Sequence, residues 1–103
     1  MAEGEPGVIE YVAVARIPEG GLEAFLAYES TVLPLLSDHG GRLDRRLRSL
    51  DERTEVHLLS FADESGLTTY RADPRRAAAA HLLAASGATV ELVPVVEVAA
   101  EEP

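Results

Sequence analysis

The first and the last apolar segments of this 103-residue chain are apolar on both of their alternating faces. Residues 8–17 read V-I-E-Y-V-A-V-A-R-I, and residues 90–98 read V-E-L-V-P-V-V-E-V. A strand with one face in a core and the other in water alternates apolar and polar side chains, and neither segment does so. A chain of this length is too short to build a second layer over the second face. We therefore expect a second copy of the protein to cover it.

The remaining segments alternate between strand and helix patterns. Helical spacing predicts a helix over 22–38, with an apolar stripe that consists of Leu22, Phe25, Leu26, Val32, Leu33 and Leu36. Pro34 is expected to kink this helix or divide it in two, and Gly40 and Gly41 are expected to end it. Strands are predicted over 8–17, 42–50, 54–61 and 89–98, and further helices over 64–72 and 74–86.

This order of elements is that of the ferredoxin-like split βαβ fold, in the α+β class. Its four-stranded antiparallel sheet carries helices on one face only. Two such sheets packed face to face form a dimeric α+β barrel. We therefore predict a homodimer that buries Val12 and Val14, or their neighbours, on the sheet face without helices.

The chain is predicted to be one domain over residues 8–98, with flexible acidic tails at 1–7 and 99–103. Its formal net charge is −9. Because affinity for nucleic acid comes mainly from cations that neutralise phosphates, we expect no nucleic-acid partner. No apolar run approaches the roughly 18 residues that suggest a membrane span, and the N-terminus lacks the order of a signal peptide. We expect no membrane association and a cytoplasmic location.

Five residue types are absent: Lys, Asn, Gln, Trp and Cys. Their absence excludes a Schiff-base lysine, a cysteine nucleophile, a disulfide and a side-chain amide in an oxyanion hole. The sequence has no phosphate loop or dinucleotide fingerprint, and its histidines lack the i, i+4 spacing of a metal motif. We therefore predict neither a cofactor nor a metal site.

Several short motifs follow one another in the middle of the chain. They are Tyr28, V-L-P-L-L at 32–36, H-G-G-R-L at 39–43, L-L-S-F at 58–61 and Y-R-A-D-P at 70–74. In these motifs the chain resembles, over residues 8–98, a family of small bacterial dimeric α+β barrel proteins of unknown function. The wider superfamily includes antibiotic-biosynthesis monooxygenases and polyketide cyclases. The resemblance implies a ferredoxin-like domain and a dimer.

The chain also departs from these proteins. The family usually has a second aromatic residue just after the position of Tyr70 and another shortly after Pro74, where this chain has Arg71 and Arg75–Arg76. The monooxygenases of the superfamily typically use an Asn, a Trp and an Arg. Since Asn and Trp are absent here, the resemblance does not carry over that mechanism.

Glu29 is the most unusual residue of the predicted helix, because its spacing places it near the centre of the apolar stripe. A carboxylate that faces the sheet must be paired, hydrogen-bonded or protonated. One interpretation is a general acid or base with a raised pKa that lines a pocket between helix and sheet. The other is a structural Glu paired with an Arg, or displaced to solvent by the kink at Pro34.

The three histidines are candidates for proton transfer near neutral pH. His57 lies in a predicted strand on the same face as Leu59 and Phe61, where a hydrogen-bonded core residue is the alternative to a catalytic one. His39 ends the helix over 22–38, where its positive charge would also stabilise the helix end. His81 is either a substrate-binding residue or a surface residue.

Tyr28 and Tyr70 are candidates to donate hydrogen bonds to a substrate oxygen. Strict alternation in the segment over 42–50 predicts Arg42, Arg46 and Arg48 on one face. It places Arg45 with Leu43 and Leu47 on the other. Arginine on both faces favours a partly exposed edge strand over an anion site. We expect Arg71, Arg75 and Arg76 to be solvated.

Two functions are compatible with these residues. The first is a small-molecule enzyme without an organic cofactor, which performs proton transfer, isomerisation, cyclisation or oxygenation on an apolar, carbonyl-bearing substrate. Glu29 with His57 or His39 would be its proton-transfer pair, and the substrate-binding residues would be Tyr28, Tyr70 and His81. The alternative is a non-catalytic homodimeric module that binds a ligand or a partner. The sequence leaves open whether the protein is an enzyme.

Overall fold

The structure is a computed structural model that describes residues 7–100, so most of the two predicted tails lies outside the described residues. In chain order the elements are β1 (Ile9–Arg16), α1 (Leu22–Val32), the 3-10 helix η1 (Leu33–His39), β2 (Gly41–Arg48), β3 (Thr54–Phe61), α2 (Glu64–Arg71), α3 (Pro74–Ser86) and β4 (Thr89–Val95). This is the α+β ferredoxin-like fold with a four-stranded antiparallel sheet, as the sequence predicted.

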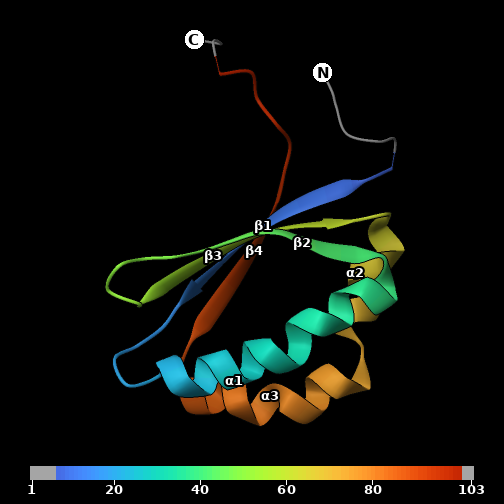
Figure 1. The fold of residues 1–103 in the computed structure, drawn as a ribbon. Helices are drawn as coiled ribbons and strands as arrows, with labels where there is room; N and C mark the ends of the chain where they lie inside the picture. Colours follow the sequence, from blue (N-terminus) through green and yellow to red (C-terminus); the bar gives the residue numbers. More distant parts are fainter. Residues whose placement is uncertain (1–6, 101–103) are drawn as a thin grey trace.

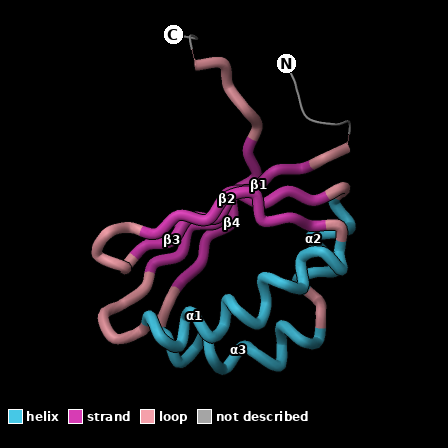
Figure 2. Tube along the Cα trace, viewed as in Figure 1, coloured by secondary structure: helices cyan, strands magenta, loops and turns pink. Residues whose placement is uncertain are grey.

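The strands lie in the order β2-β3-β1-β4, so that β1 and β3 are internal and β2 and β4 form the two edges. The helices cover one face of this sheet and leave the other face open (Figures 1 and 2). On the covered face of β1, Tyr11, Ala13 and Ala15 are buried. The alternate residues Val12 and Val14 lie on the open face and are only half-buried.

The last strand is shorter and more exposed than the sequence suggested. It ends at Val95 instead of continuing to Val98. On its open face Val93 is 38% exposed, because β4 is an edge strand and this chain supplies no layer above it. The apolar pattern on both faces of β1 is therefore satisfied on the helix-covered side alone. On β4 it is not satisfied even there, because Val90, which pairs with the buried Ala15, is 47% exposed.

Local signals in the sequence account for the helix boundaries. Because Pro34 lacks an N–H and cannot continue a regular α-helix, the chain changes at Leu33 into the tighter helix η1. The predicted division of the helix at this proline is thus confirmed. Gly40, in the left-handed conformation with φ of 69°, ends η1. The side chains of Asp63 and Asp73 accept hydrogen bonds from backbone N–H groups in the first turns of α2 and α3.

The helices α1 and α3 lie side by side beneath the sheet (Figure 1). Tyr28 and Val32 of α1 pack against Ala79 of α3, whose small side chain allows a close approach. At the far end of the pair, a Cβ atom on Gly21 would collide with the carbonyl of Ser86, so glycine is required where α1 begins. None of the described helices is long and apolar enough to cross a membrane.

Candidate functional site

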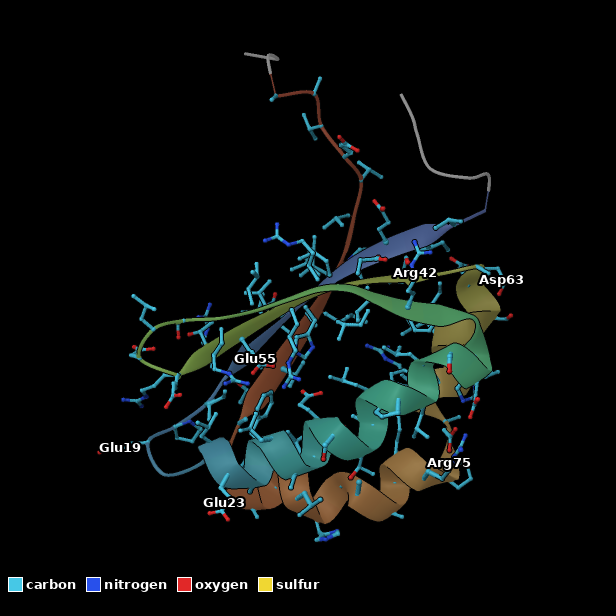
Figure 3. The ribbon with its side chains drawn as sticks, in the orientation of Figure 1. Glu19, Glu23, Arg42, Glu55, Asp63 and Arg75 are labelled. Atoms are coloured by element: carbon cyan, nitrogen blue, oxygen red, sulfur yellow. The ribbon has the colours of Figure 1, made fainter. Side chains whose placement is uncertain are left out.

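A buried carboxylate lies at the centre of a charged cluster between the sheet and α1. Glu55 of β3 is fully buried, and its side chain points from the sheet toward α1 (Figure 3). It accepts hydrogen bonds from Arg46 Nε at 2.8 Å, Arg46 Nη2 at 3.4 Å, Arg48 Nε at 2.7 Å and His57 Nε2 at 2.7 Å. Burial opposes its ionisation, but the hydrogen bonds from Arg46, His57 and Arg48 outweigh that effect and lower the pKa of Glu55 to about 2. Glu55 is therefore ionised at neutral pH.

The state of Glu55 fixes the tautomer of His57. An ionised carboxylate can only accept hydrogen bonds, so His57 Nε2 must carry the proton that it shares with Glu55 Oε1. No hydrogen bond from the described residues reaches Nδ1 of this imidazole. In the neutral ring, Nδ1 is the nitrogen with an available lone pair, which is the arrangement that a general base requires.

A β-bulge turns Arg46 and Arg48 toward Glu55. Leu43 pairs with Leu59 and Arg45 with Leu58, so Asp44 is an extra residue in β2. Beyond the bulge the two arginines pair with His57 and Glu55, on the face that the helices cover. Strict alternation had predicted Arg46 and Arg48 on the same face as Arg42, with Leu43 on the other face. That prediction was wrong. The expectation that this strand forms an edge of the sheet is confirmed.

Glu29 lies on α1 and is 5% exposed, consistent with its place on the apolar stripe. Burial raises the pKa of this carboxyl to about 7. The negative charge of Glu55 acts in the same direction, and Arg46 and Arg76 act against it. A group with this pKa is present in both protonation states at neutral pH and can both take and give a proton.

The carboxyl oxygens of Glu29 are not sealed from solvent. Among the described residues, Arg76 Nε is the one fully enclosed side-chain nitrogen or oxygen without a hydrogen-bond partner. Glu29 has no hydrogen-bond partner among those residues either. Its oxygens must therefore remain in contact with water, which leaves a route for a proton to reach them.

Arg76 of α3 joins two tyrosines beside Glu29. Its guanidinium lies over the ring of Tyr70, 4.7 Å from the centroid, and its Nη2 donates a hydrogen bond to the hydroxyl of Tyr28 at 3.0 Å. The Tyr70 hydroxyl donates to the carbonyl of Val32 at 2.9 Å, and burial raises the pKa of Tyr70 to about 12. The Tyr28 hydroxyl therefore accepts a hydrogen bond and can donate its own proton to a ligand, whereas the Tyr70 hydroxyl already donates its proton to the backbone. The expectation that Arg76 is solvated was wrong, because its nitrogens contact Tyr28 and the ring of Tyr70.

The other two predicted histidines have different surroundings. His39 Nε2 lies 2.8 Å from Asp73 Oδ2, and its Nδ1 lies 2.8 Å from Thr69 Oγ1. These contacts tie the end of η1 to the junction of α2 and α3. His81 is exposed on α3 and its Nδ1 contacts the carbonyl of Ala78 at 3.1 Å. The structure thus groups Glu29, Tyr28 and Tyr70 with the cluster around His57, and it leaves His81 outside that group.

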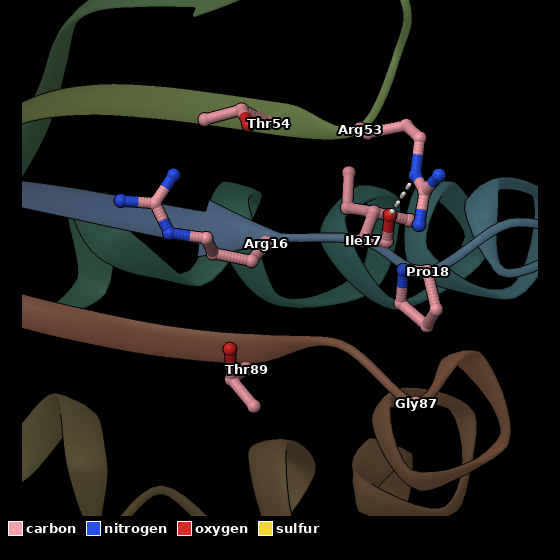
Figure 4. A pocket seen from close by; sticks show the side chains of 7 residues that line it. All are labelled: Arg16, Ile17, Pro18, Arg53, Thr54, Gly87 and Thr89. Atoms are coloured by element: carbon pink, nitrogen blue, oxygen red, sulfur yellow. Dashed lines mark hydrogen bonds between the residues drawn. The ribbon is translucent and has the colours of Figure 1, made fainter.

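The structure also has a shallow depression of about 410 Å³ at one end of the sheet (Figure 4). Its lining residues are Arg16, Ile17, Pro18, Arg53, Thr54, Gly87 and Thr89. Figure 4 shows the Arg53 side chain turned to the carbonyl of Ile17, to which its Nε donates at 3.3 Å. None of the predicted site residues lines this depression.

The sequence reasoning missed four residues of the cluster, which are Glu55, Arg46, Arg48 and Arg76. One signal was available, since Glu55 and His57 are two residues apart in a strand and therefore share a face. A carboxylate beside a histidine on a buried face predicts a hydrogen-bonded pair. The arginines gave no comparable signal, because the bulge and the reach of a long side chain decided where they lie.

Comparisons with known proteins establish the fold. No protein-family model matches the chain, and no curated protein does. SnoaB, a cofactor-independent oxygenase from Streptomyces nogalater, matches with a TM-score of 0.74 at 17% identity, over 93% of this chain and 99% of SnoaB. A Nitrosomonas europaea protein provisionally assigned as an antibiotic biosynthesis monooxygenase matches with a TM-score of 0.73 at 14% identity, over 89% and 91% of the two chains. A NIPSNAP-family protein of unknown function from Agrobacterium tumefaciens matches with a TM-score of 0.65 at 16% identity, over 97% and 98%. The chain therefore has the fold of the dimeric α+β barrel proteins.

Proposed function

We propose that the protein is an enzyme without an organic cofactor that transfers a proton on an apolar, carbonyl-bearing substrate in the layer between the helices and the sheet. The observation that carries this proposal is the pair of buried carboxyl groups whose environments separate their pKa values, about 7 for Glu29 and about 2 for Glu55. Two titratable groups arranged in this way indicate an acid–base site. Glu29 is the member that exchanges protons.

The residues have distinct roles in this proposal. Glu29, when ionised, takes a proton from the carbon next to the substrate carbonyl, and the Tyr28 hydroxyl donates a hydrogen bond to the resulting enolate oxygen. Where a second proton leaves the substrate, His57 accepts it at Nδ1, and Glu55 stabilises the resulting imidazolium through Nε2 until that proton is given back. Tyr70 positions Arg76 through its ring.

Return of the proton from Glu29 to a different carbon completes an isomerisation. In a cyclisation the enolate carbon attacks a second carbonyl carbon of the same substrate, the C=O π bond opens, and the alkoxide takes the proton from Glu29. An enolate can also react with dioxygen, and the likeness to SnoaB, a cofactor-independent oxygenase, supports oxygenation as a third outcome. All three begin with the same proton abstraction, so one assay tests them together.

The proposed enzyme is a homodimer through the open face of the sheet. Val12, Val14 and Val93 lie on this face, with Val56 and Leu58 of β3 between them and β2. Leaving such a surface in water is unfavourable by about 25 cal/mol per Å² of apolar area, and a second copy would remove it from solvent. The fold of the dimeric α+β barrel proteins supports this assignment.

Solvent deuterium incorporation tests the proposal. The neutral ketone 2-tetralone in D₂O has exchangeable hydrogens next to its carbonyl, and proton NMR follows their loss. We expect the protein to accelerate the exchange, with a pH profile that rises as Glu29 ionises around pH 7. Glu29→Gln should reduce the acceleration by about 10²-fold or more. Glu23→Gln is the matched control, because Glu23 is exposed in the first turn of the same helix. Equal rates for the two variants would count against the proposal.

A non-catalytic homodimeric module that binds a ligand or a partner is the second candidate. The observation that favours it is that the depression in Figure 4 contains none of the proton-transfer residues. A module of this kind would leave the exchange of 2-tetralone at the buffer rate. Its ligand affinity would be the same in wild type and Glu29→Gln.

A further inference from the structure

Arg46 and Arg48 have more hydrogen-bond donors than Glu55 can use. Each guanidinium has five N–H groups. Glu55 takes Nε and Nη2 of Arg46 and Nε of Arg48, and with His57 Nε2 its two oxygens already accept four hydrogen bonds. That number fills the lone pairs of a carboxylate. The remaining donors of the two arginines are therefore available to another acceptor.

These donors can be reached from solvent. The Arg46 and Arg48 side chains are each 34% exposed, whereas Glu55 beneath them is fully buried. Both arginines lie on β2, which is an edge strand, so no further strand covers them. The buried carboxylate thus holds two guanidinium groups side by side at the edge of the layer that contains Glu29.

The layer also carries an excess of positive charge. Arg46, Arg48 and Arg76 face one carboxylate that is ionised at neutral pH, Glu55, and one carboxyl, Glu29, that is neutral when protonated. The chain as a whole has a formal net charge of −9, so this excess does not follow from its composition. Arg46 and Arg48 share the single negative charge of Glu55, so one of their two positive charges is not balanced by it, and an anion from outside the protein would balance it.

We propose that Arg46 and Arg48 bind a carboxylate group of the substrate, so that the site takes apolar carbonyl compounds that carry a carboxylate. The planar fork of a guanidinium matches a carboxylate in a bidentate geometry. Because Glu55 already fixes both side chains, little conformational freedom is lost when the ligand binds. The positive charge of Arg46 lowers the pKa of Glu29, which is consistent with a carboxylate subsite in the same layer as the proton-transfer group. The reaction rests on the proposed function, but the binding does not and is measured without turnover.

Two probes with the same naphthalene ring and similar size, one charged and one neutral, test this subsite. The probes are 2-naphthoate, which is an anion, and 2-naphthamide, which is neutral, and both are titrated into the ¹⁵N-labelled protein by NMR. We expect the wild-type protein to bind 2-naphthoate at least 10-fold more tightly than 2-naphthamide. This preference should be lost as the salt concentration rises. The backbone resonances of β2 should shift with 2-naphthoate and not with 2-naphthamide. Equal affinity for the two probes would overturn the proposal.

Variants then assign the preference to the arginines. Arg48→Gln should weaken 2-naphthoate about 10-fold or more, the effect of losing a charge-assisted hydrogen bond. Arg71→Gln is the control. Arg71 is exposed on α2, and its substitution removes the same charge from the chain. Arg48→Lys is a second variant in case Arg48→Gln does not fold, because it keeps the positive charge and loses only the planar guanidinium. Its affinity for 2-naphthoate should fall by less than that of Arg48→Gln. An equal loss in Arg71→Gln would show that the preference is a property of the net charge and would refute the subsite.

The outcomes separate this subsite from the proposed reaction. Tight 2-naphthoate binding without exchange of 2-tetralone would keep the carboxylate subsite and reject the proton-transfer enzyme. Exchange of 2-tetralone without a preference for 2-naphthoate would keep the enzyme and reject the subsite. Inorganic phosphate serves as a competitor, and displacement of 2-naphthoate by phosphate at equal concentration would show a general anion site instead of one selective for carboxylates.

Discussion

Replacing Glu29 by glutamine should change how the stability of the protein depends on pH. In the folded protein, burial and the charge of Glu55 raise the pKa of this carboxyl from its ordinary value of 4.5 to about 7. The folded state therefore holds a proton that the unfolded chain has already released between those two values. Each pKa unit corresponds to about 1.4 kcal/mol, so the raised pKa lowers the free energy of unfolding by about 3 kcal/mol once the pH exceeds 7.

The sign of the effect follows from proton linkage. Stability that depends on protonated Glu29 is fully present below pH 4.5, declines as the pH rises and is lost above about pH 7. Glutamine cannot titrate, so its burial changes the free energy of unfolding of Glu29→Gln by the same amount at every pH. The difference in the free energy of unfolding between variant and wild type should therefore increase by about 3 kcal/mol in favour of the variant between pH 4.5 and pH 8.

Urea unfolding followed by far-ultraviolet circular dichroism measures this difference at a series of pH values. All samples are held at one protein concentration, because association would make the apparent stability depend on it. Glu23→Gln is the control, since Glu23 is exposed on the same helix, and its pH profile should run parallel to that of wild type. A parallel profile for Glu29→Gln would refute the reasoning, because it would mean that Glu29 titrates alike in the folded and unfolded states.

Two further substitutions probe the open face and the arginine of α3. Val14→Asp would place an unpaired charge on the open face. We expect light scattering to detect a dimer for the wild-type protein, and we expect Val14→Asp to dissociate or unfold that dimer. A wild-type protein that is a stable monomer at micromolar concentration would contradict the dimer. Arg76→Met should raise the pKa of Glu29 above its wild-type value, because the positive charge of Arg76 favours the ionised carboxyl. An NMR titration of Glu29 measures that pKa, and an unchanged or lower value would contradict the placement of Arg76.

Much of the fold could be predicted because its boundaries depend on local chemistry. The strand over 54–61 and the helix over 74–86 have the bounds that the sequence indicated, since Asp73 and Pro74 begin that helix and Gly87 ends it. The order of elements then selected the ferredoxin-like arrangement. The last strand was predicted too long, because its apolar pattern continues to Val98 although its pairing with β1 ends at Val95.

The site was only partly predictable for a physical reason. Helical spacing was sufficient to place Glu29 in the interior, since α1 stays regular past that position. Arg76 was misjudged because α3 is rich in alanine on all sides, so that no apolar stripe distinguishes its inner face. A long side chain can also carry its charge from the side of a helix to a distant partner, here the hydroxyl of Tyr28.

The bulge at Asp44 links the site to the open face of the sheet. With regular pairing after Leu43, Arg46 and Arg48 would lie on the open face, and Leu47 would lie against Glu55. The proposed interface would then contain Arg46 and Arg48 in place of Arg45 and Leu47, and a buried carboxylate would face an apolar side chain. The extra residue exchanges these positions, so that Leu47 joins the apolar open face and the two arginines compensate Glu55. One inserted residue thus serves both proposed surfaces, because the interface becomes more apolar and the interior gains the donors that a carboxylate substrate requires.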